Sequence, residues 1–175
     1  GGNEVTAFGM DPESWGEVKS SNYVHLRGVH VFQWGNLLEE EKIGLIWKRI
    51  AEVAKEFANE QGFPLDILDL GGGLGISYKD ASRRVSWKVL QQKIREAKEI
   101  SGAQEIWLEL GRYAVGPFGS YVTQVEERKV VRGKNILLCR GGSHHLVRPA
   151  LVGESFPAQV LGRSTDYLST FEVHG

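Results

Sequence analysis

The 175-residue chain contains one cysteine, Cys139, and no apolar run near the ~20 residues that cross a bilayer. A single cysteine excludes an internal disulfide and is typical of a reducing compartment, so we predict a cytoplasmic protein. The charges nearly balance, with a net charge of -1. We therefore expect no nucleic-acid partner and no membrane partner, because both favour proteins with an excess of basic residues.

Common catalytic motifs are also missing. The glycines of 71–75 do not match the G-x-G-x-x-G pattern of dinucleotide-binding proteins, and no Lys-Ser/Thr pair follows them as in a P-loop. No Gly-x-Ser-x-Gly elbow indicates a serine hydrolase. His144 and His145 are adjacent, but neighbouring residues of a strand point to opposite faces, and no Cys, Asp or Glu cluster completes a ligand set. We therefore predict no metal site.

Strand and helix patterns alternate along the first two thirds of the chain. Residues 23–34, 65–70 and 105–110 are rich in β-branched, aromatic and other apolar residues, as in buried strands. Residues 37–60 and 87–100 lie between them and repeat apolar residues at helical spacing. Short joins in this alternation predict an α/β fold with a parallel sheet, whose ligand-binding loops follow the carboxyl ends of the strands.

Each predicted helix has one apolar stripe. Ser86 stands where the N-cap of the second helix belongs. The stripe residues are Ile43, Ile46, Trp47, Ile50, Val53, Ala54 and Phe57 in the first helix, and Trp87, Leu90, Ile94 and Ala97 in the second.

The pattern changes after Pro117. Residues 120–131 and 135–139 read as strands with no helix between them, joined by a hairpin at 132–134. We therefore expect a second, mostly β region that begins near residue 115.

Two motifs at predicted strand ends carry chemistry. Four glycines fall within residues 71–75, and a later strand ends in Glu109, followed one turn on by Arg112. Backbone amides and an arginine suit a phosphate, while a nearby acid suits a protonated ring nitrogen, so the pair predicts a pyridoxal phosphate pocket. The alternatives are a tight turn at the glycines, a surface salt bridge between Glu109 and Arg112, and a core position for His30.

The order of the motifs resembles the fold-type III pyridoxal-phosphate decarboxylases, which include diaminopimelate, ornithine and arginine decarboxylases. The similar family patterns are S-K-F-G-M/I, G-x-H-x-H, G-G-G-x-G, E-P-G-R-x-x-V and G-G-x-x-x-L-x-R-P-A-L, found here at 6–10, 28–32, 71–75, 109–115 and 141–151. The resemblance implies that residues 1–114 form the later part of a (β/α)8 barrel, and residues 115–175 the start of a β-rich C-terminal domain. It also implies a homodimer with shared active sites.

The same resemblance assigns the candidate site residues. Glu109 would face the pyridine nitrogen, and His30 and Phe32 would line the ring. The phosphate would be held by Gly72, Gly73, Gly75, Gly111 and Arg112. Arg148 and Asp166 would lie in the substrate site, where Arg148 would bind a substrate carboxylate in bidentate fashion.

The chain departs from the family pattern at several places. Phe32 replaces the second histidine of G-x-H-x-H, and residues 33–36 lack a clear phosphate-binding serine. The family's G-P-x-C-x-x-x-D segment is three residues short at 162–166 and lacks its acid cysteine. The family's Schiff-base lysine comes from an earlier part of the barrel. We therefore expect the chain to be part of a longer protein, with its catalytic lysine and cysteine elsewhere.

By resemblance, the activity would be decarboxylation of an α-amino acid-type substrate with pyridoxal phosphate. Val152 stands where a tyrosine often follows R-P-A-L, which argues against recognition of diaminopimelate. The motifs around 119–125 and 140–142 look closer to the siderophore branch, which decarboxylates carboxylated conjugates. The alternatives are diaminopimelate decarboxylase, a non-catalytic regulatory relative, and a barrel protein that binds another phosphate ligand.

Overall fold

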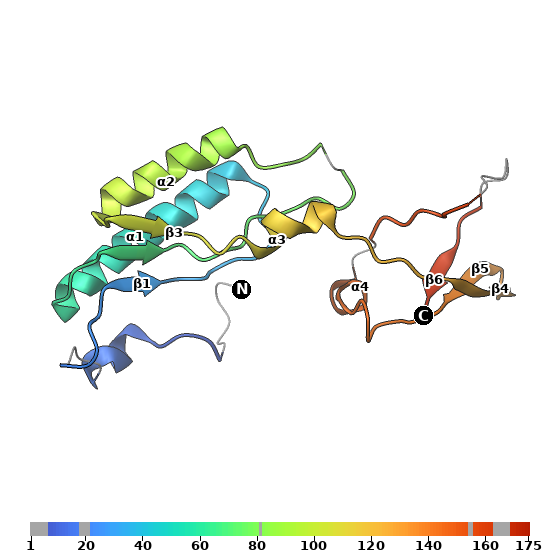
Figure 1. Ribbon diagram of the computed structural model, residues 1–175, viewed down its shortest axis with the longest axis horizontal. Helices are drawn as coiled ribbons and strands as arrows, with labels where there is room; N and C mark the ends of the chain where they lie inside the picture. Colours follow the sequence, from blue (N-terminus) through green and yellow to red (C-terminus); the bar gives the residue numbers. More distant parts are fainter. Residues whose placement is uncertain (1–6, 18–21, 81, 154–155, 163–168) are drawn as a thin grey trace. The chain divides into compact units, whose positions relative to one another are not determined.

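The computed structural model describes residues 7–17, 22–80, 82–153, 156–162 and 169–175 (Figure 1). The chain divides into two compact units, unit 1 from Gly1 to Phe118 and unit 2 from Gly119 to Gly175. Strands and helices alternate in unit 1, whereas unit 2 is mostly β. The predicted α/β class is confirmed.

Unit 1 is built on a parallel sheet in the order β1-β2-β3. The strands are β1 (Gly28–His30), β2 (Ile67–Asp69) and β3 (Glu105–Trp107). The connecting helices α1 (Glu40–Gln61) and α2 (Trp87–Ser101) lie together on one side of this sheet (Figure 1). The predicted parallel pairing is therefore confirmed.

Helix α1 forms because its apolar residues repeat on one face and a glycine ends it. Ile43, Trp47, Ile50 and Ala54 are buried, as the stripe predicts, but Val53 is 37% exposed because it lies at the edge of that stripe. Gly62 adopts a left-handed conformation with φ 72°, which closes the helix. A short 3-10 helix, η1 (Pro12–Glu17), packs on α1 through an edge-to-face contact of Trp15 and Phe57, with ring centroids 5.1 Å apart.

Helix α2 buries Leu90 and Ala97 against α1, whereas Trp87, predicted on the same stripe, is 48% exposed in the first turn. Ser86 occupies the N-cap position, but its side chain makes no capping hydrogen bond. Its amide instead donates to the Glu40 side chain at 2.5 Å, so α1 and α2 are joined at their amino-terminal ends.

The strands are shorter than predicted. The apolar segment 23–34 contributes only three residues to β1, because β2, its partner, pairs over three residues. Single hydrogen bonds continue the pairing beyond the strands: the Val31 amide donates to Asp69 O at 3.1 Å, and the Glu109 amide donates to Gly71 O at 2.9 Å. The backbone at the carboxyl ends of all three strands is therefore fixed by its neighbours.

After the short α3 (Gly111–Val115) and η2 (Gly116–Phe118), unit 2 forms a sheet in the order β4-β5-β6. Antiparallel β4 (Val125–Val131) and β5 (Lys134–Cys139) meet at Arg132 and Gly133, whose φ values of 49° and 80° suit a two-residue hairpin. This hairpin was predicted. The other elements are β6 (Glu172–His174), parallel to β5, and α4 (Arg148–Val152).

No helix in the described parts of the chain is long and apolar enough to span a membrane.

Candidate active site

Three side chains from different strand ends meet on the sheet face opposite the helices. His30 pairs in register with Asp69, and Glu109 follows two residues after Trp107, the partner of Asp69 on β3. Residues two apart on a strand share a face, so all three point to the same side. His30 Nε2 lies 3.3 Å from Glu109 Oε2, and one ligand atom from each of the three residues lies within 4.8 Å of the others. We call His30, Asp69 and Glu109 the strand-end triad.

The glycine loop, residues 71–75, is pressed against the ends of its neighbouring segments. A Cβ atom at Gly73 would lie 2.0 Å from Trp34 O, and one at Gly72 would lie 2.3 Å from Glu109 O. At Gly75 it would lie 2.6 Å from Leu37 O. Backbone carbonyls of the protein itself therefore require glycine at these three positions.

Not every amide of the loop is available to a phosphate. The Gly75 amide donates to Leu37 O at 2.6 Å, and the Gly71 amide donates to Asp69 Oδ1 at 2.9 Å. The Gly75 amide therefore holds the loop to its neighbour, whereas the amides of Gly72 and Gly73 have no acceptor within the part of the chain that the structure describes.

Arg112 lies in α3, directly after the strand end that carries Glu109. Its Nη1 atom is buried and has no hydrogen-bond partner within the described residues. The alternative of a salt bridge to Glu109 is not observed there, since Glu109 contacts His30 instead. The Gly111 amide is used locally, donating to Glu109 O at 3.1 Å. A buried guanidinium nitrogen without an acceptor is suited to an anionic ligand.

Two residues of the loop after β1, Phe32 and Asn36, have surroundings that bear on the site. Phe32 is 59% exposed, and its ring lies close enough to Gly71 that a Cβ atom there would be 3.2 Å from Phe32 Cδ2. Asn36 holds a left-handed φ of 59°, and its Oδ1 accepts the Ile76 amide at 3.1 Å. Asn36 was not predicted from the sequence, because only the folded loop brings it to Ile76.

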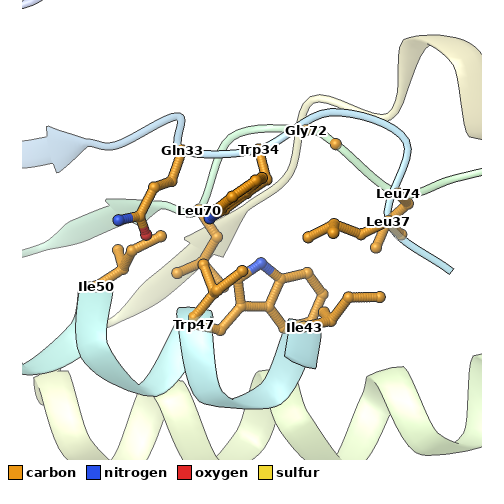
Figure 2. A pocket seen from close by; sticks show the side chains of 11 residues that line it. Gln33, Trp34, Leu37, Ile43, Trp47, Ile50, Leu70, Gly72 and Leu74 are labelled. Carbon is orange, nitrogen blue, oxygen red and sulfur yellow. The ribbon is translucent and has the colours of Figure 1, made fainter. Parts of the chain in front are cut away.

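A small pocket lies on the helix side of the glycine loop, away from the strand-end triad. Figure 2 shows Trp34, from the loop after β1, and Trp47, from α1, on two sides of this pocket. Lys42 places its Nζ 4.4 Å from the centre of the Trp34 ring. The lining residues are Gln33, Trp34, Leu37, Ile43, Ile46, Trp47, Ile50, Leu70, Gly72, Gly73 and Leu74. This mainly apolar lining makes the pocket part of the packing beneath the loop.

In unit 2, Arg148 begins α4 and is half-buried. His144 and His145 lie in a turn, and their ring centroids are only 4.0 Å apart. The expectation that they point to opposite faces is therefore wrong, because it assumed a strand. His145 Nδ1 also lies 2.9 Å from Tyr121 Oη. Asp166, the other predicted substrate residue, is outside the described residues.

The described residues fit pyridoxal phosphate at both of its ends. A carboxylate with two polar neighbours stands at the end of β3, and a buried guanidinium nitrogen without a partner follows within one turn. The strand-end triad also has the composition of a divalent-metal site, which the sequence argument did not identify. Asp69 is not among the residues predicted from the sequence, although it lies at the end of a predicted strand, two residues before the glycine run.

Comparison with known proteins identifies the class. The family model described as pyridoxal-dependent decarboxylase, pyridoxal binding domain, matches residues 1–116. The chain therefore belongs to this family, the fold-type III pyridoxal-phosphate decarboxylases, and the predicted resemblance and cofactor class are confirmed.

Individual relatives are 27–29% identical to the chain over the aligned residues. Diaminopimelate decarboxylase from Bacillus methanolicus is 29% identical over 170 residues, which cover 90% of this chain and 39% of that protein. The Staphylococcus aureus decarboxylase of an alanin-3-ylcarbamoylmethyl-substituted hydroxybutanedioate is 27% identical over 139 residues, 78% of this chain and 35% of that protein. The chain thus spans well under half the length of these curated relatives.

The same fold occurs in a solved structure. A mutant of diaminopimelate decarboxylase from Helicobacter pylori, complexed with L-lysine, superposes with a TM-score of 0.73 and 27% identity. The match covers 87% of this chain and 38% of that one.

Proposed function

We propose that this chain supplies the pyridoxal phosphate site of a decarboxylase that acts on an α-amino acid-type substrate. The observation that carries the proposal is the grouping of Glu109 with His30 and Asp69 at the strand ends, in a chain of this family. A carboxylate at that position holds a proton on a pyridine nitrogen. Bound pyridoxal phosphate would supply the electron sink that decarboxylation needs, and Glu109 would keep its ring nitrogen protonated.

Each residue would have a separate role in binding the cofactor. Glu109 would hold the ring nitrogen, and Phe32 and His30 would line the ring. The amides of Gly72 and Gly73 and the guanidinium of Arg112 bind the phosphate, since a planar fork of donors matches phosphate oxygens. Arg148, together with Asp166, would bind the substrate.

The larger assembly is part of the same proposal. Unit 1 would form the later part of a (β/α)8 barrel and unit 2 the start of a C-terminal β domain. The full-length protein would be a cytoplasmic homodimer whose subunits share active sites. The family's fold supports the barrel, and the lone Cys139 supports a reducing compartment.

The cofactor claim is tested by titrating the full-length protein with pyridoxal phosphate and following the absorbance of the bound cofactor. Arg112→Ala should weaken binding by roughly 10- to 100-fold, because a charge-assisted pair is lost. Arg112→Lys should recover only part of the affinity, since a lysine keeps the charge without the fork. Arg95→Ala, on the exposed face of α2, is the matched control and should bind as the wild type does.

Any of three results would contradict this part of the proposal. The first is failure of the wild type to bind the cofactor, and the second is unchanged binding by Arg112→Ala. The third is the absence of a modified lysine in the full-length protein after borohydride reduction and peptide mapping.

The substrate is the second question. We propose a carboxylated conjugate of the kind named for the Staphylococcus aureus relative, because Val152 stands where a tyrosine would support diaminopimelate. The alternative is diaminopimelate, the substrate named for the Bacillus methanolicus relative. Carbon dioxide release should be measured with each compound. Turnover of diaminopimelate alone would favour the alternative, and cofactor binding without turnover of either would favour a regulatory relative.

A further inference from the structure

The strand-end triad contains more polar groups than a ring nitrogen needs. Glu109 alone would serve as its partner, yet His30 Nε2 lies 3.3 Å from Glu109 Oε2, and Asp69 completes the cluster. We propose that His30 is a positioning residue, which fixes the Glu109 carboxylate so that its second oxygen meets the ring nitrogen. This inference rests on the proposed function.

Glu109 needs such a partner because its side chain is free to move. It is 59% exposed, and a glutamate with that freedom populates several rotamers, each of which aims the carboxylate differently. The backbone, in contrast, is held, since the Glu109 amide donates to Gly71 O. What remains to be fixed is the direction of the carboxylate, and the contact with His30 selects one.

His30 is itself held in position by the sheet. It pairs in register with Asp69, and the next residue, Val31, donates its amide to Asp69 O at 3.1 Å. The imidazole therefore reaches across the short Asp69 side chain toward Glu109 from a fixed backbone. Asp69 is anchored in turn, because its Oδ1 accepts the Gly71 amide.

The replacement at Phe32 strengthens the argument. Phe32 is two residues after His30, on the same side of the extended chain, and its ring cannot donate a hydrogen bond. His30 is thus the only imidazole within 28–36 that can act on Glu109. We therefore expect His30 to act on the carboxylate, and Phe32 to contact the ring by its face.

The test uses two cofactors and matched variants of the full-length protein, after dialysis against a chelator. His30→Leu removes the donor, whereas His30→Gln keeps an N–H group near the place of Nε2. His25→Leu removes an exposed histidine outside the triad. Affinity is measured for pyridoxal phosphate and for an analogue that has a carbon atom in place of the ring nitrogen, with the ¹⁵N signal of labelled cofactor as a second readout.

His30→Leu should weaken pyridoxal phosphate by about tenfold and alter the ¹⁵N signal, while His30→Gln and His25→Leu stay within about twofold of the wild type. The carbon analogue should bind all four proteins equally, because Glu109 has no nitrogen to meet. Equal losses for both cofactors in His30→Leu would overturn the inference, since His30 would then support the ring or the fold directly.

Two further results are decisive. Zn²⁺ that binds the wild type and displaces pyridoxal phosphate would overturn the inference, because the triad would then be a metal centre. Failure of the wild type to bind pyridoxal phosphate at all would overturn the proposed function, and this inference with it.

Discussion

Unit 1 and unit 2 are stabilised in different ways. Every buried apolar residue among the described positions belongs to unit 1, between Ile43 and Ala103. Unit 2 has no fully buried residue among its described positions, and all seven residues of β4 are exposed. A sheet that buries little apolar surface depends more on its hydrogen bonds and ion pairs for its order. Unit 1, which carries the candidate site, therefore rests on a packed core, whereas unit 2 does not.

The largest expected effect lies in the core of unit 1. Leu68 on β2 is fully buried, so Leu68→Ala should lower the free energy of unfolding by about 2–5 kcal/mol. Val130→Ala in unit 2, at a position 65% exposed, should change it by no more than ~0.5 kcal/mol. Unfolding in urea is followed by far-UV circular dichroism, which reports on both units, and by tryptophan fluorescence, which reports on unit 1 because all five tryptophans lie there. Similar losses in both variants would contradict the conclusion that only unit 1 depends on a packed core.

The glycine loop should show the next largest effect. Gly73→Ala places a Cβ atom 2.0 Å from Trp34 O at a φ of 91°. Gly62→Ala serves as control, because Gly62 has a φ of 72° and open space around it. The control should cost ~1–2 kcal/mol for the left-handed backbone, and Gly73→Ala about 1–3 kcal/mol more for the collision. If the two variants unfold at the same urea concentration, the close approach of the carbonyl is not required.

A smaller effect is expected above the packed loop. Lys42 lies over the Trp34 ring, and Lys42→Met should remove ~0.5–1 kcal/mol of attraction while keeping the aliphatic stem. The change should also shift the tryptophan fluorescence of the folded protein. Lys88→Met, an exposed position in α2, should leave both measurements as in the wild type.

The smallest effect concerns unit 2. The hydrogen bond between Lys134 and Glu172 raises the pKa of the lysine above 10.5 and lowers the pKa of the glutamate below 4.5. The stability that the carboxylate adds is therefore lost as pH falls through the lowered pKa of Glu172. The stability that the ammonium group adds is lost as pH rises through the raised pKa of Lys134. In Glu172→Gln, the stability of β5 and β6 should change less with pH at both the acidic and the basic end of the range, as measured by hydrogen exchange. A large loss at neutral pH would contradict this surface position.

The sequence predicts the helices better than the strands. Helix ends depend on local signals, so Gly62 and Gly102 place the ends of α1 and α2 within a residue or two. Strand length depends on a distant partner, and for that reason the long apolar segment around β1 forms only three residues of sheet.

The candidate site divides in the same way. The glycines and Glu109 can be found from the sequence because they adjoin strand ends, and Arg112 follows them. The carbonyls that make Gly73 necessary, and the reach of His30 toward Glu109, come from other segments of the chain. His144 and His145 lie close together because residues 143–145 form a turn, whereas the alternation expected from the sequence holds only in a strand.

The hydrogen bond from the Glu109 amide to Gly71 O joins the acidic end of the site to its glycine end through backbone atoms alone. Side-chain rotation cannot lengthen that connection, and the carbonyl packed against Gly72 prevents the loop from moving closer. The spacing between the two ends of the candidate site is therefore set by the main chain. For the proposed cofactor, we expect weaker binding when the phosphate arm is absent or longer, because the ring and the phosphate would not then reach both ends together.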